Sequence, residues 1–323
     1  MIRTSHYLFA ALCLGSLFAC SRQFTDSYIV PKWCFAVFML FIVLAYEAVN
    51  ILFYRQNEQK DTRISVYGFI IVISCFLQAM FGVVQFFGFF QISTTLWVTG
   101  SFDNPAGFAA CLCAGFPFVG FLLSDSNKYI RYVGGLIGFV IVIAVILSQS
   151  RAGIMSIAFI CFILLNMKFF HKRWVKYLSL LCFALLLSGC YWMKKDSADG
   201  RLLIWRCSVS MVKDAPWLGH GIGSFEARYM DYQADYFRQY GLNRYSMLAD
   251  NVKHPFNEYL GVLLNFGFVG LLMILALITL LIYCYKKHPC AEKRIAFCSL
   301  ISIGVFSFFS YTFTYPFTWI VTF

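Results

Sequence analysis

Long uninterrupted apolar stretches recur along the whole sequence and restrict its possible folds more than any other feature. About 20 consecutive apolar residues can cross a bilayer as a helix. The sequence predicts nine such helices, at residues 7–20, 33–54, 66–90, 102–123, 130–147, 153–170, 175–193, 256–285 and 295–321. Only 13% of the residues are charged, against about 25% in soluble domains. We therefore expect an all-α polytopic membrane protein, with residues 1–323 forming one membrane domain in a lipid bilayer.

The distribution of basic residues predicts the topology. Of the 26 lysines and arginines, 14 lie in one alternating set of connecting segments, three in the opposite short loops and nine in one long loop. Cytoplasmic segments are the ones enriched in basic residues. We therefore expect the N-terminus, Lys172 and Lys286 to be cytoplasmic, and the long loop with Tyr232 to lie outside. The net charge of +11 is then mainly a topology signal, and we expect no nucleic-acid partner.

The long loop, residues 193–255, is the one extended polar segment of the chain. Asp199 is a suitable N-cap. Four apolar residues follow it at helical spacing, namely Leu202, Trp205, Val209 and Val212. We therefore expect a helix whose apolar stripe lies against the membrane or the helical bundle. The loop also contains five arginines, namely Arg201, Arg206, Arg228, Arg238 and Arg244.

Two arginines are candidate anion ligands at the outer membrane surface. Arg201 would fall in the first turn of the predicted helix, where backbone N–H groups also attract anions. Arg151 lies at the outer junction of two predicted spans, against the general charge bias. The structural alternatives are a solvated arginine on an amphipathic helix for Arg201 and a snorkelling side chain for Arg151.

A glycine-rich segment follows the predicted helix of the long loop. Pro216 is expected to end that helix, and Gly219, Gly221 and Gly223 allow a tight turn. No predicted strand precedes these glycines, so they do not form a dinucleotide-binding fingerprint. His220, within the turn, is a secondary candidate for a general base.

The long loop ends in residues 254–258, with the sequence HPFNE. Proline is favoured at the first helical position, so we expect His254 at the N-cap of the next span. The positive end of the helix dipole would then disfavour protonation, and a neutral imidazole suits a general base. Glu258 would lie one turn along, on the same face, and orient the ring. The structural alternative is a polar cap followed by an interfacial carboxylate.

A fourth polar segment, residues 99–107, begins a predicted span on the outer side. Its Asn104-Pro105 pair favours a turn, so the structural interpretation is a helix entry. The cysteines form no CxxC pair and lie mostly in apolar runs, where small buried side chains are expected. Because the sequence also lacks an Asp-x-Asp motif or a histidine cluster, we expect neither a metal nor a cofactor.

Taken in order, these segments resemble the O-antigen ligase/polymerase family, which includes protein O-oligosaccharyltransferases. The resemblance extends over residues 99–285. The matching segments are residues 99–105, 150–153, 200–201 with Trp205, 216–225, 254–260 and 266–271. Family members usually have more spans than the nine expected here, so a chain truncated from a longer bundle is an alternative to a complete protein.

The resemblance implies an enzyme of the bacterial inner (cytoplasmic) membrane with a GT-C-like fold. Such an enzyme takes a glycan from undecaprenyl diphosphate and passes it to an acceptor on the periplasmic face without a metal. By this resemblance Arg151 and Arg201 bind the diphosphate, and His254 activates the acceptor hydroxyl with Glu258 beside it. The supporting residues would be Trp205, Asn257, Gly219, His220 and Gly221.

Several functions remain open at this level. The acceptor is the lipid A core in a ligase, which we favour slightly, another lipid-linked repeat unit in a polymerase, or a protein hydroxyl. A flippase or transporter of lipid-linked glycans is the main alternative of another class, followed by a non-catalytic assembly protein. A transporter should carry its ionisable residues near the middle of the membrane, whereas the charges here concentrate at the outer surface.

Overall fold

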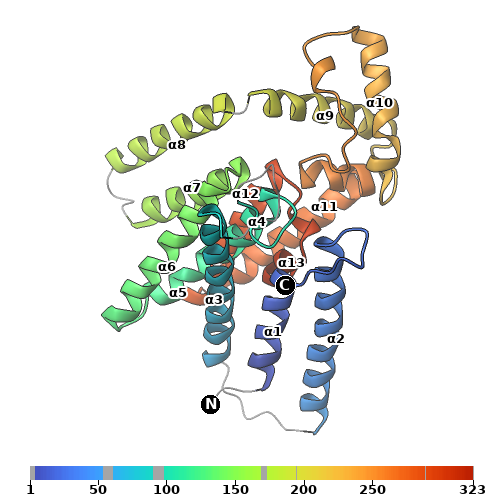
Figure 1. Cartoon of the computed structure of the whole chain (residues 1–323). Coiled ribbons are helices and arrows are strands. Elements are labelled where there is room, and N and C mark those ends of the chain that lie inside the picture. The colour runs from blue at the N-terminus through green and yellow to red at the C-terminus, as the bar shows by residue number, and fades with distance from the viewer. Residues whose placement is uncertain are drawn as a thin grey trace. The chain divides into compact units, whose positions relative to one another are not determined.

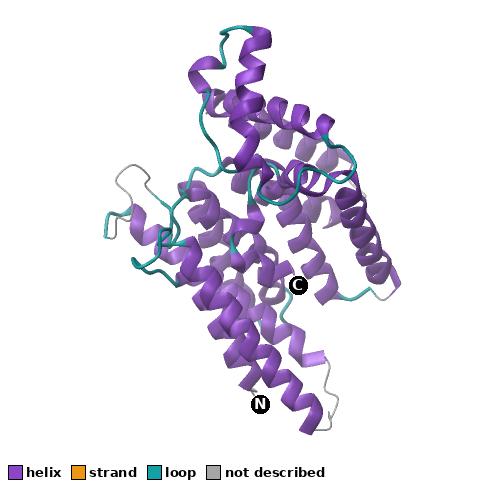
Figure 2. Cartoon of the chain, turned by 90° about the vertical axis from the view of Figure 1, so that its right-hand side faces the viewer, coloured by secondary structure: helices purple, strands orange, loops and turns teal. Residues whose placement is uncertain are grey.

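The computed structural model describes residues 4–53, 61–89, 98–168, 173–193, 195–287 and 289–322 (Figure 1). Over these residues the secondary structure is helical, without strands (Figure 2), which confirms the predicted all-α class. The chain forms two compact units. The first comprises Met1–Cys161, Cys290–Phe306 and Thr312–Phe323, and the second Phe162–Pro289 and Ser307–Tyr311.

The first unit is built from the N-terminal helices and the last part of the chain. Its helices are α1 (Thr4–Phe18), α2 (Ile29–Phe53), α3 (Asp61–Phe86), α4 (Pro105–Gly115), η1 (Phe116–Phe118), α5 (Val119–Leu123), α6 (Lys128–Leu147), most of α7 (Arg151–Lys168) and of α12 (Ala291–Phe309), η3 (Thr312–Thr314) and α13 (Pro316–Thr322).

The second unit contains the long polar loop, which is mostly helical. Its helices are α8 (Arg173–Met193), α9 (Lys195–Asp214), α10 (Ser224–Tyr240), η2 (Ser246–Leu248) and α11 (Glu258–Lys287). The expected helix in the loop is confirmed as α9, and it ends just before Pro216 as predicted. It begins four residues before Asp199, however, so Asp199 is a buried residue inside the helix and the prediction of an Asp199 cap is wrong.

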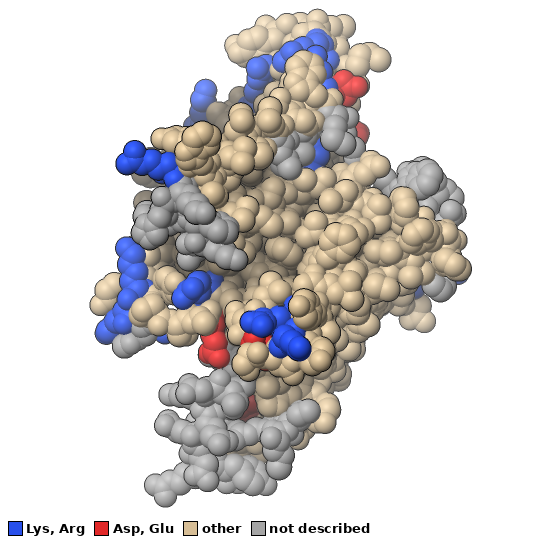
Figure 3. Space-filling model, turned by 90° about the vertical axis from the view of Figure 1, so that its left-hand side faces the viewer, with Lys and Arg blue, Asp and Glu red and all other residues tan. Residues whose placement is uncertain are grey.

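Several helices are long and apolar enough to cross a membrane, which makes this a multi-pass membrane protein. Among the described residues there are five, at Ile29–Asn50, Val66–Phe86, Pro105–Leu123, Lys128–Leu147 and Glu258–Lys287. Thr4–Phe18 and Arg151–Asn166 are shorter apolar helices. Most of the surface in Figure 3 carries neither basic nor acidic side chains, as lipid-facing helices require. Nine spans and a GT-C-like fold remain predictions.

The last predicted span, residues 295–321, is wrong as a single helix. Helix α12 ends at Phe309, and α13 begins at Pro316. Proline suits a helix start, because its missing N–H is not needed in the first turn. The interruption leaves Tyr311 outside a helix, where its ring can contact residues of the second unit.

Small residues and serine hydroxyls hold the first unit together. The Ser156 hydroxyl of α7 donates to the Ser302 carbonyl oxygen at 2.7 Å, and the Ser302 hydroxyl of α12 donates to the Cys113 carbonyl oxygen of α4 at 2.7 Å. Ser299 donates likewise to the Ala114 carbonyl oxygen at 2.6 Å. Such interhelical hydrogen bonds stabilise helix packing where water is absent.

The second unit has its own apolar core, centred on α9. Helix α9 packs against α10 and α11 (Figure 1). The core is formed by buried side chains of these helices and of the segment after α10, namely Leu203, Ile204, Cys207, Met211, Phe225, Tyr229, Tyr245 and Leu264. Burying each large apolar side chain stabilises the unit by about 1.5–3 kcal/mol, so this core fixes the position of the polar residues on α9.

Candidate functional site

Residues from three separate segments meet in one cluster of the second unit. Helix α9 contributes Arg201 and Trp205, which are four residues apart and share a face. The segment before α11 contributes His254 and Phe256, and the segment after α12 contributes Tyr311. We call these five residues the reaction cluster. Three of them, Arg201, Trp205 and His254, were predicted from the sequence.

His254 is half-buried and stacks on Tyr311, with ring centroids 4.6 Å apart and an interplanar angle of 24°. Burial lowers the pKa of His254 below its ordinary value, and Lys253 lowers it further, while the negative charge of Glu226 raises it. The net effect favours the neutral imidazole. The expected charge state is therefore supported, but the main cause is loss of water rather than the helix dipole.

The predicted N-cap position of His254 is wrong. Helix α11 begins at Glu258, and the Asn257 side-chain oxygen accepts the Leu260 N–H at 3.1 Å, so Asn257 is the residue that caps the helix. Glu258 is the acidic residue of the first turn, a position that the helix dipole favours. The role expected for Glu258 in orienting the His254 ring remains a prediction.

The Arg201 guanidinium is held by a carbonyl oxygen and an aromatic ring. Its Nη1 donates to the Phe309 carbonyl oxygen at 2.6 Å, and its central carbon lies 5.1 Å from the centroid of the Phe256 ring. A cation over the face of an aromatic ring is attracted by the negative charge of that face. Because α9 begins at Lys195, Arg201 is not in its first turn, and that prediction is wrong.

Trp205 fixes the segment that carries His254. Its indole N–H donates to the Pro255 carbonyl oxygen at 3.0 Å, and its ring meets the Phe308 ring edge-on at a centroid distance of 5.9 Å. The next residue, Phe256, has a φ of 51°, which is a strained conformation for a bulky side chain. Strain of this kind costs about 1–3 kcal/mol and is concentrated at functional sites.

The glycine-rich segment packs against a break in α11. At Gly267 the helix has φ 61° and ψ −159°, which interrupts its hydrogen bonds. The His220 N–H donates to the Leu264 carbonyl oxygen at 2.7 Å and the Gly221 N–H to the Asn265 carbonyl oxygen at 3.1 Å. A Cβ on Gly219 would lie 2.6 Å from the α11 backbone, so only glycine fits there.

The His220 ring is part of the same packing. Its Nε2 lies 2.7 Å from the Met211 carbonyl oxygen, and its Nδ1 lies 3.1 Å from Nη1 of Arg228. A carbonyl oxygen can only accept, so Nε2 carries the proton and Nδ1 accepts from Arg228. Both ring nitrogens are therefore engaged in holding the turn. These contacts agree with the supporting role expected for His220, and its secondary role as a general base stays a prediction.

Arg151 lies in the first unit, whereas the other predicted site residues lie in the second. It is the first residue of α7, directly after the turn residue Ser150. The Ser150 hydroxyl accepts the Gly153 N–H at 3.4 Å and caps the helix. Gln149, just before, has a φ of 52°. Of the two described non-glycine residues with positive φ, Phe256 lies in a segment with family resemblance and Gln149 directly precedes one.

The fourth segment is a helix entry, as its structural interpretation predicted. The Asn104 side-chain oxygen accepts the Gly107 N–H at 2.9 Å, and Pro105 begins α4. Lys32 reinforces this entry from α2. Its ammonium donates to the Ser101 carbonyl oxygen at 2.8 Å and lies 4.9 Å from the centroid of the Phe102 ring.

The sequence analysis missed four residues at these sites. Lys32 was counted only as an outer-loop charge, but it is buried. Tyr311 was placed inside a span, and Phe256 was treated only as the start of one. Glu226 lies on α10, a helix that we did not predict, although Phe225, Tyr229, Tyr232 and Tyr236 recur at helical spacing and are a sufficient signal. Within the described part of the chain, no group of three His, Cys, Asp or Glu side chains is arranged to hold a metal ion.

The fold is thus that of a multi-pass helical membrane protein, and its candidate site lies in segments outside the five apolar helices long enough to span a membrane among the described residues. Residues 136–275, somewhat less than half of the chain, match the family model described as O-antigen ligase, which confirms the predicted resemblance to this family over that region. Members of this family are membrane enzymes of the glycosyltransferase type. No curated protein and no solved structure gives a significant match to the chain.

Proposed function

We propose that the protein transfers a glycan from undecaprenyl diphosphate to an acceptor hydroxyl at the periplasmic face of the bacterial inner membrane. The observation that carries the proposal is the reaction cluster. Its Arg201 cation and its neutral His254 are joined through two rings, because Phe256 contacts both the Arg201 guanidinium and Tyr311, on which His254 stacks. The family match supports a glycan-related substrate.

The chemistry needs a base and a fixed positive charge. The acceptor oxygen bonds to the sugar carbon while the bond from that carbon to the diphosphate breaks, and the bonding electrons leave with the diphosphate. His254 takes the hydroxyl proton, and Arg201 stabilises the charge on the departing diphosphate. Arginine suits this role because it stays charged and binds phosphate oxygens in pairs. The predicted contribution of Arg151 to diphosphate binding is part of the same proposal.

Two substitutions separate these roles. His254→Ala should leave donor binding intact and lower the transfer rate by roughly 10²–10⁴-fold, because only the base is lost. Arg201→Lys keeps the charge but loses the planar fork, so donor binding should weaken. Binding of undecaprenyl diphosphate-linked glycan and its transfer are measured on purified protein, with Arg22→Lys, an exposed arginine elsewhere, as the control.

The general-base assignment fails if His254→Ala loses donor binding as severely as Arg201→Ala, or if it transfers at the normal rate. The acceptor is decided by the surface glycan of a deletion strain. Unattached long chains indicate the ligase that we favour, single repeats indicate a polymerase, and normal lipopolysaccharide with unglycosylated protein indicates a protein O-oligosaccharyltransferase.

A flippase or transporter remains the alternative of a different class. Broken membrane helices are typical of transporters, and α11 is interrupted at Gly267. Here, however, the freed Phe268 and Val269 N–H groups donate to the Pro216 and Trp217 carbonyl oxygens, at 2.8 and 3.2 Å. The break is therefore filled by the chain's own backbone. Transfer of label to an acceptor, rather than movement of the intact donor across a vesicle, distinguishes the two functions.

A further inference from the structure

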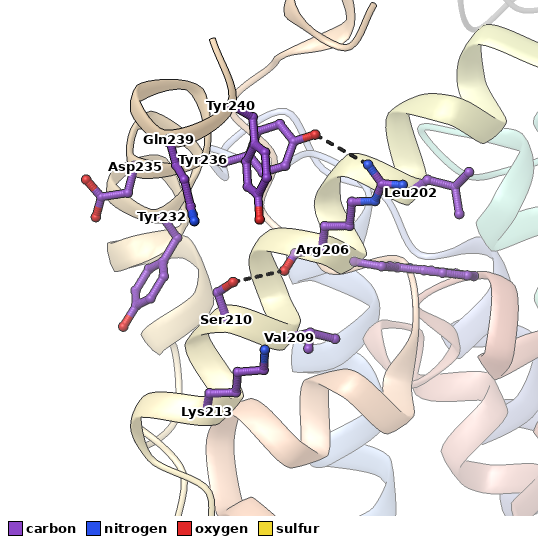
Figure 4. A pocket seen from close by; sticks show the side chains of 11 residues that line it. Leu202, Arg206, Val209, Ser210, Lys213, Tyr232, Asp235, Tyr236, Gln239 and Tyr240 are labelled. Carbon is purple, nitrogen blue, oxygen red and sulfur yellow. Dashed lines mark hydrogen bonds between the residues drawn. The ribbon is translucent and has the colours of Figure 1, made fainter. Parts of the chain in front are cut away.

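A pocket of about 670 Å³ lies between α9 and α10 in the second unit, and the roles above do not account for it (Figure 4). Its volume is within the range of small-molecule sites, about 300–1,000 Å³. The lining side chains come only from these two helices, and they are Leu202, Trp205, Arg206, Val209, Ser210, Lys213, Tyr232, Asp235, Tyr236, Gln239 and Tyr240. We call this the aromatic pocket.

The pocket uses two side chains of the predicted apolar stripe that the core leaves exposed. The sequence predicted that Leu202, Trp205, Val209 and Val212 would lie against the membrane or the bundle. In the structure Trp205 and Val212 pack against the core of the second unit, whereas Leu202 and Val209 are 36% and 44% exposed. Both exposed side chains line the aromatic pocket. Leu202 and Val209 therefore give the α9 wall of the pocket its apolar part.

The opposite wall, formed by α10, carries tyrosine rings, and two of them are held by hydrogen bonds to α9. Tyr236 and Tyr240 lie with ring centroids 4.9 Å apart, and the Arg206 guanidinium donates to the Tyr236 hydroxyl at 3.3 Å (Figure 4). The Tyr232 hydroxyl donates to a carboxylate oxygen of Asp214. These contacts hold two of the rings by their hydroxyl ends. Tyr240 is 61% exposed, so its ring is accessible from solvent.

Hydrogen-bonding groups of both kinds accompany the rings. Arg206 and Lys213 are donors, and Gln239 can donate or accept. The Ser210 hydroxyl donates to the Arg206 carbonyl oxygen at 3.4 Å and can still accept. Asp235, which is paired with Arg238 at 2.8 Å, is an acceptor. A sugar ring has an apolar C–H face, which packs on the electron-rich face of an aromatic ring, and hydroxyls around its edge. The mixture of aromatic rings with donors and acceptors matches that chemistry.

We infer that the aromatic pocket binds sugar residues of a glycan substrate, an assignment that rests on the proposed transferase function. Trp205 links the pocket to the reaction, because its ring lines the pocket and its N–H holds the Pro255 carbonyl oxygen, next to His254. A glycan in the pocket thus contacts the residue that positions the base. The glycan belongs either to the donor or to the acceptor, which share this chemistry.

The test measures binding of lipid-free sugars to the purified full chain by calorimetry. One probe is the oligosaccharide released by mild acid from the strain's own lipid-linked glycan, and the other is the deacylated core oligosaccharide. Tyr240→Ala removes an exposed ring and should weaken binding of one probe by roughly 3- to 10-fold. Tyr240→Phe keeps the ring and should bind nearly as the wild type does. Met230→Ala, on α10 outside the pocket, is the control.

Weakening confined to the released oligosaccharide assigns the pocket to the donor, and weakening confined to the core oligosaccharide assigns it to the acceptor. Gln239→Ala, an exposed change, gives a second test if Tyr240→Ala does not fold. The inference is overturned if the wild type binds neither probe, if the pocket variants bind both unchanged, or if they alter only binding to anionic lipid vesicles. Failure of the proposed function is seen separately, as absence of transfer by the wild type.

Discussion

The break in α11 gives a quantitative prediction for Gly267→Ala. The φ of 61° and ψ of −159° at this position define a conformation that is essentially confined to glycine, and a side chain there costs about 1–3 kcal/mol. A Cβ would also lie 2.3 Å from the Trp217 carbonyl carbon and oxygen. Moving that backbone weakens the hydrogen bonds from Phe268 to Pro216 and from Val269 to Trp217, each worth about 1 kcal/mol. We expect a loss of about 3–5 kcal/mol in the free energy of unfolding.

The measurement is thermal unfolding of the purified protein in detergent. With about 2 °C per kcal/mol for a large chain, the midpoint should fall by roughly 6–10 °C. Gly261→Ala is the matched control on the same helix, because its Cβ would meet Pro255 and Glu258 only at 3.7 and 3.9 Å. That change should be neutral or stabilise by up to about 1 kcal/mol. Equal midpoints for the two variants would refute the backbone packing described at Gly267.

Three further predictions concern the site and the topology. The transfer rate should fall as the pH drops through the lowered pKa of His254, because the imidazole becomes protonated. Glu226→Gln removes a negative charge that raises this pKa, so the acidic limb of the pH–rate profile should move to lower pH. Transfer by purified enzyme should survive EDTA, and loss restored by Mg²⁺ would contradict the arginine mechanism. A cysteine at Tyr232 should be labelled from outside and one at Lys286 should not, in a background lacking native thiols; the reverse would overturn the topology. Lys172, expected to be cytoplasmic, lies outside the described residues.

Local signals were sufficient to predict part of the site. Proline before a helix and the spacing of apolar residues located α9 and the entry to α4, because these features act within one or two turns. Arg201 and Trp205 were placed on one helix face for the same reason. The neutral state of His254 was also expected, although its cause was misassigned, since burial depends on residues far away in the sequence.

Other parts of the site depend on contacts between distant segments. Tyr311 lies 57 positions after His254, in a stretch whose composition favours a continuing helix. Whether α12 ends at Phe309 depends on contacts with other segments of the chain. A hydropathy profile contains no information about those contacts. The break at Gly267 likewise needs a partner segment to accept and donate its hydrogen bonds. Glycine at this position permits such a break but does not require it.

The interruption after α12 bears on whether the segment that matches the family can form the site by itself. The family match ends at residue 275, yet the ring that stacks on His254 and the carbonyl oxygen that holds Arg201 come from Tyr311 and Phe309. A chimera that transplants only the matched segment into another scaffold would leave behind the support of both groups. Recombination between homologues is therefore expected to preserve the site only when the crossover lies beyond position 311. The matched segment and the residues that contact His254 and Arg201 then come from the same parent.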